Sequence, residues 1–265
     1  REPVGSIEKK VEVNQSNWKI TDQIFGGTWA EALACWKKWA HASGSRVVCF
    51  ANVHMSIESR RRPNFNRVMQ SADMICADGQ PLVWLTQRLR KEPVQRIAGM
   101  DALPMLLQEA EQEGIRCYFY GGSSEMLAQL SDWMEVHHPQ LSYQFYSPPF
   151  GPLEALDFDA EANRVNQVGA QWIFVVLGCP KQEEWMHQMQ GKVQGVMFGV
   201  GGALPVLLGM QSRAPKWMQR NGLEWFYRLI QEPRRMWKRY LVTNVVFIAW
   251  VLRLLLIERK NNVQG

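Results

Sequence analysis

Residues 77–84 read Ala-Asp-Gly-Gln-Pro-Leu-Val-Trp, and this stretch decides how the rest of the chain is interpreted. The apolar run before it, residues 74–77, is short enough to be a buried strand. Gly79 permits a sharp turn, and Pro81 suits the first turn of a following helix. Asp78 is therefore expected at the end of a strand, where ligands bind in open α/β sheets. The alternative is that Asp78 only caps the helix.

The rest of the chain alternates apolar strands with stretches of helical periodicity. Thr28 to Glu31 form a capping-box pattern that predicts the start of a helix, and Asp101 is expected to cap another. The other predicted strands are residues 47–52, 116–120, 141–145, 172–177 and 196–200. The repeated strand–helix order predicts an α/β fold, with a mostly parallel sheet and helices on both of its faces.

Small or polar residues follow four of these strands, namely Asn52, Asp78, Gly121-Gly122 and residues 178–182. The carboxyl ends of parallel strands meet at one edge of the sheet, so we expect these loops to converge. Glycine-rich turns that lead into helices bind phosphate through free backbone N–H groups. None of the loops matches Gly-x-Gly-x-x-Gly or the P-loop, and a tight turn without ligand explains a single Gly-Gly equally well.

Charge divides the chain into unequal parts. From residue 212 onward there are 11 Lys and Arg against 3 Glu, a balance of +8, whereas the whole chain has 30 − 25 = +5. The first 211 residues therefore carry about −3. We expect a polar tail at 1–17, an α/β core at 18–211 and a basic, aromatic, helical part at 212–265. The positive balance of this last part points to an anionic partner.

The 212–265 segment also contains an apolar run, residues 245–252, that is followed by Arg253. This run is shorter than the ~20 residues needed to cross a bilayer. A basic, aromatic, amphipathic segment suits the interface of an anionic membrane, and the alternative is a helical subdomain packed on the core or on another subunit. Residues 1–17 lack an apolar signal region, and the five cysteines lack metal-ligand or paired spacing, which predicts reduced thiols in the cytosol.

Five motifs stand in order along the chain: Ala-Asp-Gly at 77–79, Arg-Ile-Ala-Gly-Met-Asp at 96–101, Gly-Cys-Pro-Lys-Gln-Glu at 178–183, Gly-Val-Gly-Gly at 199–202, and Arg-Ala-Pro at 213–215 with Gly-Leu-Glu-Trp-Phe-Tyr-Arg-Leu at 222–229. In these motifs the chain resembles the WecG/TagA/CpsF family of bacterial glycosyltransferases. The resemblance implies a Rossmann-like core with a C-terminal helical, membrane-associating appendage. It also implies inverting transfer of a sugar from a nucleotide-diphosphate donor, expected to be a UDP-sugar, to a polyprenyl-diphosphate-linked saccharide.

Such an enzyme would lie peripherally on the cytoplasmic face of the bacterial inner membrane and build cell-surface polysaccharides. Its partners would be the nucleotide-sugar donor, the lipid-linked acceptor and the anionic membrane surface, and not nucleic acid. We expect no cofactor and no bound metal, because no Asp-x-Asp pair stands at a predicted strand end to ligate a hard cation. Assembly into a homo-oligomer is left open.

The resemblance implies roles for individual residues. Asp78 matches the proposed catalytic base, which would accept a proton from the attacking acceptor hydroxyl. The substrate-binding residues that it implies are Asn52, Arg96, Gln182, Arg228 and Arg235. Of these, Arg96 would hold a phosphate, Gln182 the sugar or nucleotide, and the last two the donor diphosphate. His54 and the pair His137-His138 lack metal-ligand spacing and are interpreted as ordinary residues.

The chain departs from the family pattern at two places. Phe50 replaces a common Thr, and Leu204-Pro205 replace Phe-Asp, so the identity of the donor sugar stays open. A rival function is a catalytically weak, nucleotide-sugar-binding or assembly component of a polysaccharide complex. A dinucleotide-dependent oxidoreductase is disfavoured, because no strand–Gly-x-Gly-x-x-Gly–helix unit is present.

Overall fold

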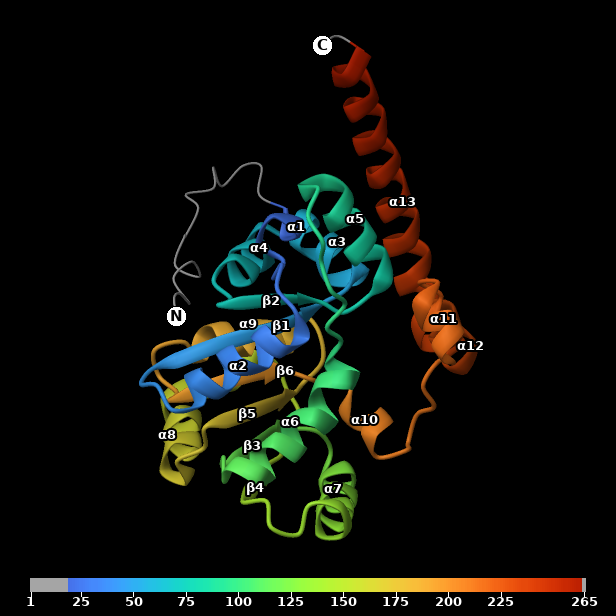
Figure 1. The fold of residues 1–265 in the computed structure, drawn as a ribbon. Coiled ribbons are helices and arrows are strands. Elements are labelled where there is room, and N and C mark those ends of the chain that lie inside the picture. Colours follow the sequence, from blue (N-terminus) through green and yellow to red (C-terminus); the bar gives the residue numbers. More distant parts are fainter. Residues whose placement is uncertain (1–18, 264–265) are drawn as a thin grey trace.

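A single six-stranded sheet forms the centre of the computed structural model, which describes residues 19–263 (Figure 1). The predicted tail at 1–17 lies outside the described residues. The strand order is β2-β1-β6-β5-β3-β4, and every neighbouring pair is parallel. The strands are β1 (Ser45–Ala51), β2 (Met74–Ala77), β3 (Cys117–Gly121), β4 (Tyr143–Tyr146), β5 (Trp172–Val176) and β6 (Gly195–Gly199). Each overlaps a predicted strand, so the prediction of a parallel α/β sheet is confirmed.

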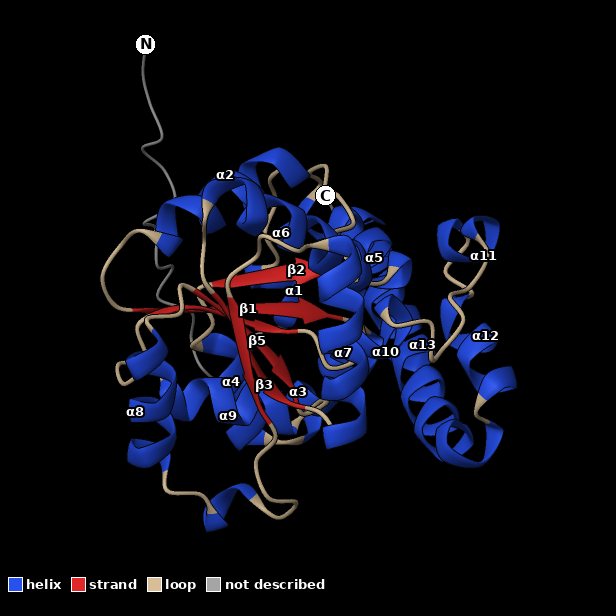
Figure 2. Cartoon of the chain, turned by 90° about the horizontal axis from the view of Figure 1, so that it is seen from below, coloured by secondary structure: helices blue, strands red, loops and turns tan. Residues whose placement is uncertain are grey.

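Helices cover both faces of this sheet (Figure 2). They are α1 (Ile20–Gln23), α2 (Trp29–Ala40), α3 (Val53–Arg61), α4 (Pro63–Gln70), α5 (Gln80–Arg90), α6 (Gly99–Glu113), α7 (Ser124–His137), the 3-10 helix η1 (Leu153–Ala155), α8 (Phe158–Val168), α9 (Lys181–Met189), α10 (Leu204–Leu207), α11 (Lys216–Arg220), α12 (Glu224–Gln231) and α13 (Pro233–Val263). The predicted capping box opens α2, where the Glu31 backbone N–H donates to Thr28 Oγ1 at 3.3 Å.

Two hydrophobic cores lie on opposite faces of the sheet because alternate strand residues point to opposite sides. One core joins α2 and α6 to the sheet and centres on Trp36, whose ring meets Phe50 and Phe198 edge-on at 6.1 and 5.5 Å. The other joins α4, α8 and α9 and contains the stacked pair Tyr120 and Trp185. Both faces of the sheet are thus covered by helices, and the edge formed by the carboxyl ends of the strands is left as the place where a binding site can form.

The alternative role of Asp78 as a helix cap is not found, and the predicted cap at Asp101 is wrong. The backbone N–H of Asp78 donates to the Ala51 carbonyl at 2.8 Å, which extends the strand pairing by one residue. Gly79 therefore takes the cap position of α5, and no side chain caps that helix. The other expected cap, Asp101, lies inside the first turn of α6, whose N-cap is Ala98. Both carboxylates are therefore left for interactions other than capping.

Between residues 240 and 252, the long helix α13 packs on the core along one side and is exposed along the other. Phe247 and Trp250 join Ile57 of α3 and Leu85 of α5 in a buried cluster. The guanidinium of Arg60 lies 4.4 Å above the Trp250 ring. Packing on the core, the alternative to membrane contact, therefore holds for one side of this helix. Within residues 19–263, no helix combines the length and the apolar character that crossing a membrane requires.

Candidate active site

A pocket of about 740 Å³, part of it open to solvent, lies where β1 and β2 end and the C-terminal helices cross over them. The core contributes the ends of β1 and β2 and the first turns of α3, α5 and α6, and the wall opposite comes from α11 to α13. The lining residues are Asn52, Val53, His54, Asp78, Gly79, Gln80, Pro81, Met100, Gln219, Gly222, Glu224, Trp225, Arg228, Tyr240, Thr243 and Asn244.

Asp78 is the carboxylate that β2 delivers to this pocket. The side chain is partly buried, and burial raises its pKa from 3.8 to about 7. The negative charge of Glu224 adds to this rise in pKa, while the positive charges of Arg96 and Arg228 oppose it. A carboxyl group whose pKa lies near neutrality exchanges protons at cellular pH, which is the property of a general base.

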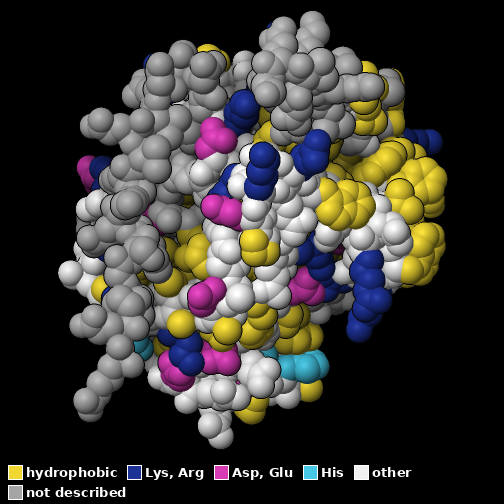
Figure 3. All heavy atoms as spheres, turned by 45° about the horizontal axis from the view of Figure 1, so that its top comes forward, with side chains coloured by type: hydrophobic (Ala, Val, Ile, Leu, Met, Phe, Trp, Pro, Cys, Tyr) yellow, Lys and Arg dark blue, Asp and Glu magenta, His cyan; other side chains and the backbone are white. Residues whose placement is uncertain are grey.

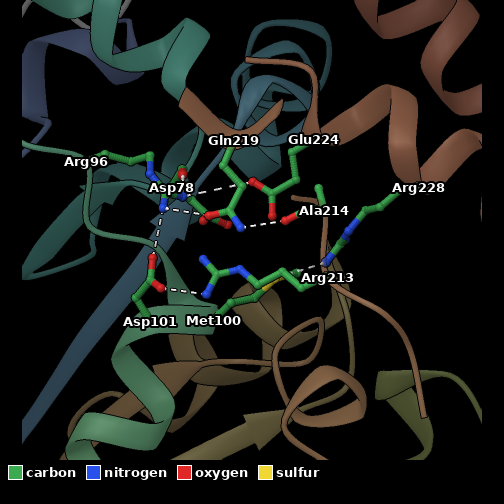
Figure 4. A network of polar contacts seen from close by, with 9 residues as sticks. All are labelled: Asp78, Arg96, Met100, Asp101, Arg213, Ala214, Gln219, Glu224 and Arg228. Atoms are coloured by element: carbon green, nitrogen blue, oxygen red, sulfur yellow. Dashed lines mark hydrogen bonds and ion pairs between the residues drawn. The ribbon is translucent and has the colours of Figure 1, made fainter. Parts of the chain in front are cut away.

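Arg96 connects the turn after β2 to α6 and to the C-terminal helices (Figure 4). Its Nη1 donates to the Asp78 backbone carbonyl at 3.2 Å and lies 3.9 Å from a carboxylate oxygen of Glu224. Its Nη2 donates to Asp101 at 2.9 Å and to Gln219 Oε1 at 3.3 Å. Much of the guanidinium is thus engaged within the protein, so Arg96 holds the site together in addition to any contact with phosphate.

Asp101 links Arg96 to a second arginine, Arg213 (Figure 4). One carboxylate oxygen accepts from Arg96, and the other accepts from Arg213 Nη1 at 2.6 Å. Burial opposes ionisation of Asp101, yet the two arginines hold the pKa of this carboxyl below its ordinary value. Within the described part of the chain, Arg213 Nε and Nη2 are buried without a hydrogen-bond partner. Arg213 thus brings positive charge beside the pocket, a position that the sequence did not reveal.

Three of the predicted site residues meet at the pocket: Asn52, Asp78 and Arg228. Asn52 Oδ1 also accepts from the backbone N–H of Met55 at 3.2 Å and so caps α3. The Nη2 of Arg228 lies 3.8 Å from Met100 Sδ. His54, interpreted from the sequence as ordinary, lines the same pocket from the first turn of α3. The position of His54 just beyond the end of a predicted strand could have indicated that it lies at the pocket.

Gln182 stands apart from this group. Gln182 is buried, its Oε1 accepts from the Gly201 backbone N–H at 3.1 Å, and its Nε2 donates to Glu183 at 2.7 Å. It connects the turns after β5 and β6 and is not one of the pocket-lining residues. Arg235 belongs to α13, but its side chain lies outside the described residues.

The four polar strand ends share one edge of the sheet but not one pocket. Gly121 and Gly122 lie at the end of β3, where the Gly122 N–H donates to the Val176 carbonyl at 2.9 Å. A Cβ on Gly121 would stand 2.5 Å from that carbonyl oxygen, so this close approach needs glycine. The end of β5 is held by Lys181, which donates to the Gly151 carbonyl at 2.6 Å. Neither end lines the pocket at β1 and β2.

The residues at the two departures from the family pattern, Phe50 and Leu204-Pro205, are not among those that line this pocket. Phe50 is buried against Trp36, and a Cβ on Gly99 would stand 3.3 Å from its ring. Its ring therefore fills the core on the α2 and α6 side and is not among the groups that line the pocket. Leu204 is likewise a core residue. Among the described residues, no group of three or more His, Cys, Asp or Glu side chains could hold a metal ion.

Comparison with known proteins now decides the family. A model described as "Glycosyl transferase WecG/TagA/CpsF family" matches residues 20–261, nearly the whole chain. The chain belongs to the WecG/TagA/CpsF family. The resemblance seen in the five sequence motifs is thereby confirmed, and the pocket built around the Ala-Asp-Gly motif is the candidate active site of a glycosyltransferase.

Relatives within the WecG/TagA/CpsF family carry a more specific name, N-acetylglucosaminyldiphosphoundecaprenol N-acetyl-beta-D-mannosaminyltransferase. The protein of Bacillus spizizenii is 32% identical over 192 residues, which cover 72% of this chain and 73% of that protein. The protein of Bacillus subtilis is 30% identical over 196 residues, covering 74% and 75%. The protein of Staphylococcus aureus strain MW2 is 27% identical over 194 residues, covering 73% and 70%.

The raised pKa of Asp78 generates a prediction about folding stability. An unfolded chain releases this proton near pH 3.8, whereas the folded protein keeps it to about pH 7. Between these values the unfolded state loses a proton that the native state retains, so ionisation of Asp78 destabilises the fold as pH rises. Asp78→Asn removes this effect, and we expect its melting temperature to exceed that of the parent by at least about 2 °C at pH 8.

Thermal melts at pH 4 and pH 8 test this expectation, since the two proteins should differ little at pH 4. Asp132→Asn, an exposed change on α7, is the matched control and should leave both melting temperatures unchanged. Equal melting temperatures of the parent and Asp78→Asn at pH 8 would show that ionisation of Asp78 does not destabilise the folded protein.

Proposed function

We propose that this protein is an inverting glycosyltransferase that moves a sugar from a nucleotide-diphosphate donor, a UDP-sugar, to a polyprenyl-diphosphate-linked saccharide in the synthesis of bacterial cell-surface polysaccharides. The observation that carries the proposal is the placement of Asp78, with its raised pKa, in a pocket that also contains Arg228. The name shared by the relatives specifies an acceptor linked to undecaprenyl diphosphate and the transfer of an N-acetylmannosaminyl group. It therefore supports the proposed class of acceptor and a hexosaminyl donor.

In the proposed reaction, Asp78 accepts the proton of an acceptor hydroxyl. The hydroxyl oxygen then forms a bond to the anomeric carbon of the donor sugar, and the bond from that carbon to the diphosphate oxygen breaks. The electron pair leaves with the nucleoside diphosphate, and attack from the opposite face inverts the anomeric centre. A base with a pKa of about 7 is partly ionised near neutral pH and still binds a proton strongly enough to accept it from the hydroxyl. The guanidinium of Arg228 stabilises the negative charge of the leaving diphosphate.

The C-terminal part, residues 212–265, is proposed to be a membrane-associating appendage of the core at 18–211. Its exposed apolar side chains include Trp217, Phe226, Ile230, Trp237, Val245, Ile248 and Leu252. Figure 3 shows hydrophobic side chains gathered beside Lys and Arg on one side of the molecule. Apolar and basic side chains together suit the interface of an anionic bilayer, and the enzyme is therefore proposed to be peripheral on the cytoplasmic face of the inner membrane.

Replacement of the base tests the proposed activity. Asp78→Asn should keep the fold and lower the transfer rate by about 10²–10⁴-fold, the range of general-base catalysis. Product mass, measured with UDP-N-acetylhexosamines and a polyprenyl-diphosphate saccharide, gives the rate. The parent rate should rise with pH through about 7 as Asp78 ionises. If Asp78→Asn stays within about threefold of the parent, the base is another residue. A parent with no turnover on any donor would favour the assembly component.

Membrane attachment is tested on the outer side of α13. A triple change of Val245, Ile248 and Leu252 to Asp should abolish cosedimentation with vesicles of phosphatidylglycerol, because these side chains are exposed and do not hold α13 to the core. Transfer to a water-soluble acceptor analogue should persist. The matched control is Val136→Asp, a change of an exposed side chain on α7, and this variant should bind vesicles like the parent. Unchanged vesicle binding by the triple variant would remove this surface from the proposal.

Transfer is also proposed to proceed without a bound metal, with arginine side chains neutralising the diphosphate. Addition of EDTA to the parent enzyme should therefore leave the rate unchanged, and Mn²⁺ or Mg²⁺ should not raise it. A rate that EDTA abolishes and Mn²⁺ restores would contradict this part of the proposal. Arg228→Gln should raise the KM for the donor in the same assay, as expected of a diphosphate ligand.

A further inference from the structure

A second carboxylate, Glu224, faces the pocket of Asp78 from the C-terminal helices. Glu224 is the first residue of α12 and lines the same pocket as Asp78. Arg96 lies between the two segments: its Nη1 is 3.2 Å from the Asp78 carbonyl oxygen and 3.9 Å from Glu224 Oε2. The pocket thus contains two acids from distant parts of the sequence, and one arginine contacts the backbone of Asp78 and the carboxylate of Glu224.

The position of Glu224 is fixed by a close contact between the turn before it and α5. Gly222 adopts a φ of +68°, a conformation that favours glycine. A Cβ at this position would stand 3.1 Å from Pro81 Cγ and 3.4 Å from the Trp84 ring. Pro81 lies in the first turn after Asp78, so the approach of the Gly222 turn to α5 is what brings Glu224 into the pocket.

We propose that Glu224 is a positioning residue for sugar transfer: its negative charge, delivered by α12, strengthens Asp78 as a base and holds Arg96 against the turn that carries it. The inference rests on the proposed function, in which Asp78 is the base. It assigns to the C-terminal helices a part in the chemistry that is separate from membrane binding and from contact with the diphosphate.

The charged and titratable groups around Asp78 decide in which direction its pKa moves when Glu224 is changed. Two acids face it, Asp101 from α6 and Glu224 from α12. The neighbouring cationic groups are Arg96, Arg228 and, through its charge interaction with Asp78, Arg213. His54 from α3 and Tyr240 from α13 also line the pocket. After burial, Glu224 makes the largest contribution to the raised pKa of Asp78. Removal of that charge therefore lowers the pKa and makes Asp78 a weaker base.

Glu224→Gln tests the proposal, because glutamine keeps the size and hydrogen-bonding ability of the side chain and removes only the charge. In the pH dependence of kcat/KM, the acidic limb of the parent should lie near pH 7, and that of Glu224→Gln should move to lower pH. The variant should be several-fold slower than the parent at pH 8, yet should approach or exceed it at pH 5.5. Glu224→Asp should restore part of the parent profile.

A role confined to folding predicts a different result, namely the same loss of rate at every pH with the acidic limb unmoved. That result would overturn the proposal. Glu125→Gln, an exposed change in the first turn of α7, is the matched control and should reproduce the parent profile. If Asp78→Asn remains active, the proposed base is wrong, and this outcome is distinct from a failure of Glu224 alone.

A measurement without turnover covers the case in which Glu224→Gln is inactive. The stabilisation that Asp78→Asn provides at pH 8 should be smaller in the Glu224→Gln background than in the parent, because the two carboxylates no longer repel each other. Thermal melts of the four proteins of this cycle give the coupling. Equal stabilisation in both backgrounds would show that Glu224 does not act on Asp78, and the proposal would fall.

Discussion

The site depends on a carboxylate that is kept at the buried end of a parallel strand. Asp78 is placed there by one backbone hydrogen bond, from its N–H to the Ala51 carbonyl at 2.8 Å, which extends the pairing of β1 and β2 beyond the last residue of the strand. Gly79, not Asp78, is the N-cap of α5, so the Asp78 side chain is not used for capping and lines the pocket instead. Partial burial then makes its ionisation costly, and the neighbouring charges decide at which pH it ionises.

The arginines around Asp78 connect segments that the chain separates widely. Asp101 holds Arg96 from the loop before α6 and Arg213 from the segment before α11, and Arg96 in turn reaches Gln219 and Glu224. A partly buried network of this kind is costly when one partner is lost, because the remaining charges stay desolvated. The C-terminal helices therefore rest on the core through polar contacts at the pocket and through the apolar contacts of Phe247 and Trp250 farther along.

The sequence predicted the sheet well, because its information is local. Continuous apolar runs such as residues 172–177 and the capping box at Thr28 need no knowledge of distant partners. The family motifs predicted Asp78 and Arg228, and both line the pocket. Neither periodicity nor propensity could show that Asp101 pairs with two arginines instead of capping α6, or that Phe50 turns into the core. Those outcomes depend on which residues meet across the fold, 112 positions apart in the pair of Asp101 and Arg213.

The two sides of α13 show why its role could not be read from composition. Tyr240, Thr243 and Asn244 close the pocket, and Phe247 and Trp250 continue the same side of the helix onto α3 and α5. Val245, Ile248 and Leu252 lie on the other side and are more than half exposed. One apolar stretch thus contains residues that complete the pocket and residues that face outward, interleaved at helical spacing. The outward-facing side chains therefore lie on the side of α13 opposite the residues that close the pocket, and no count of apolar residues along the chain could separate these two groups.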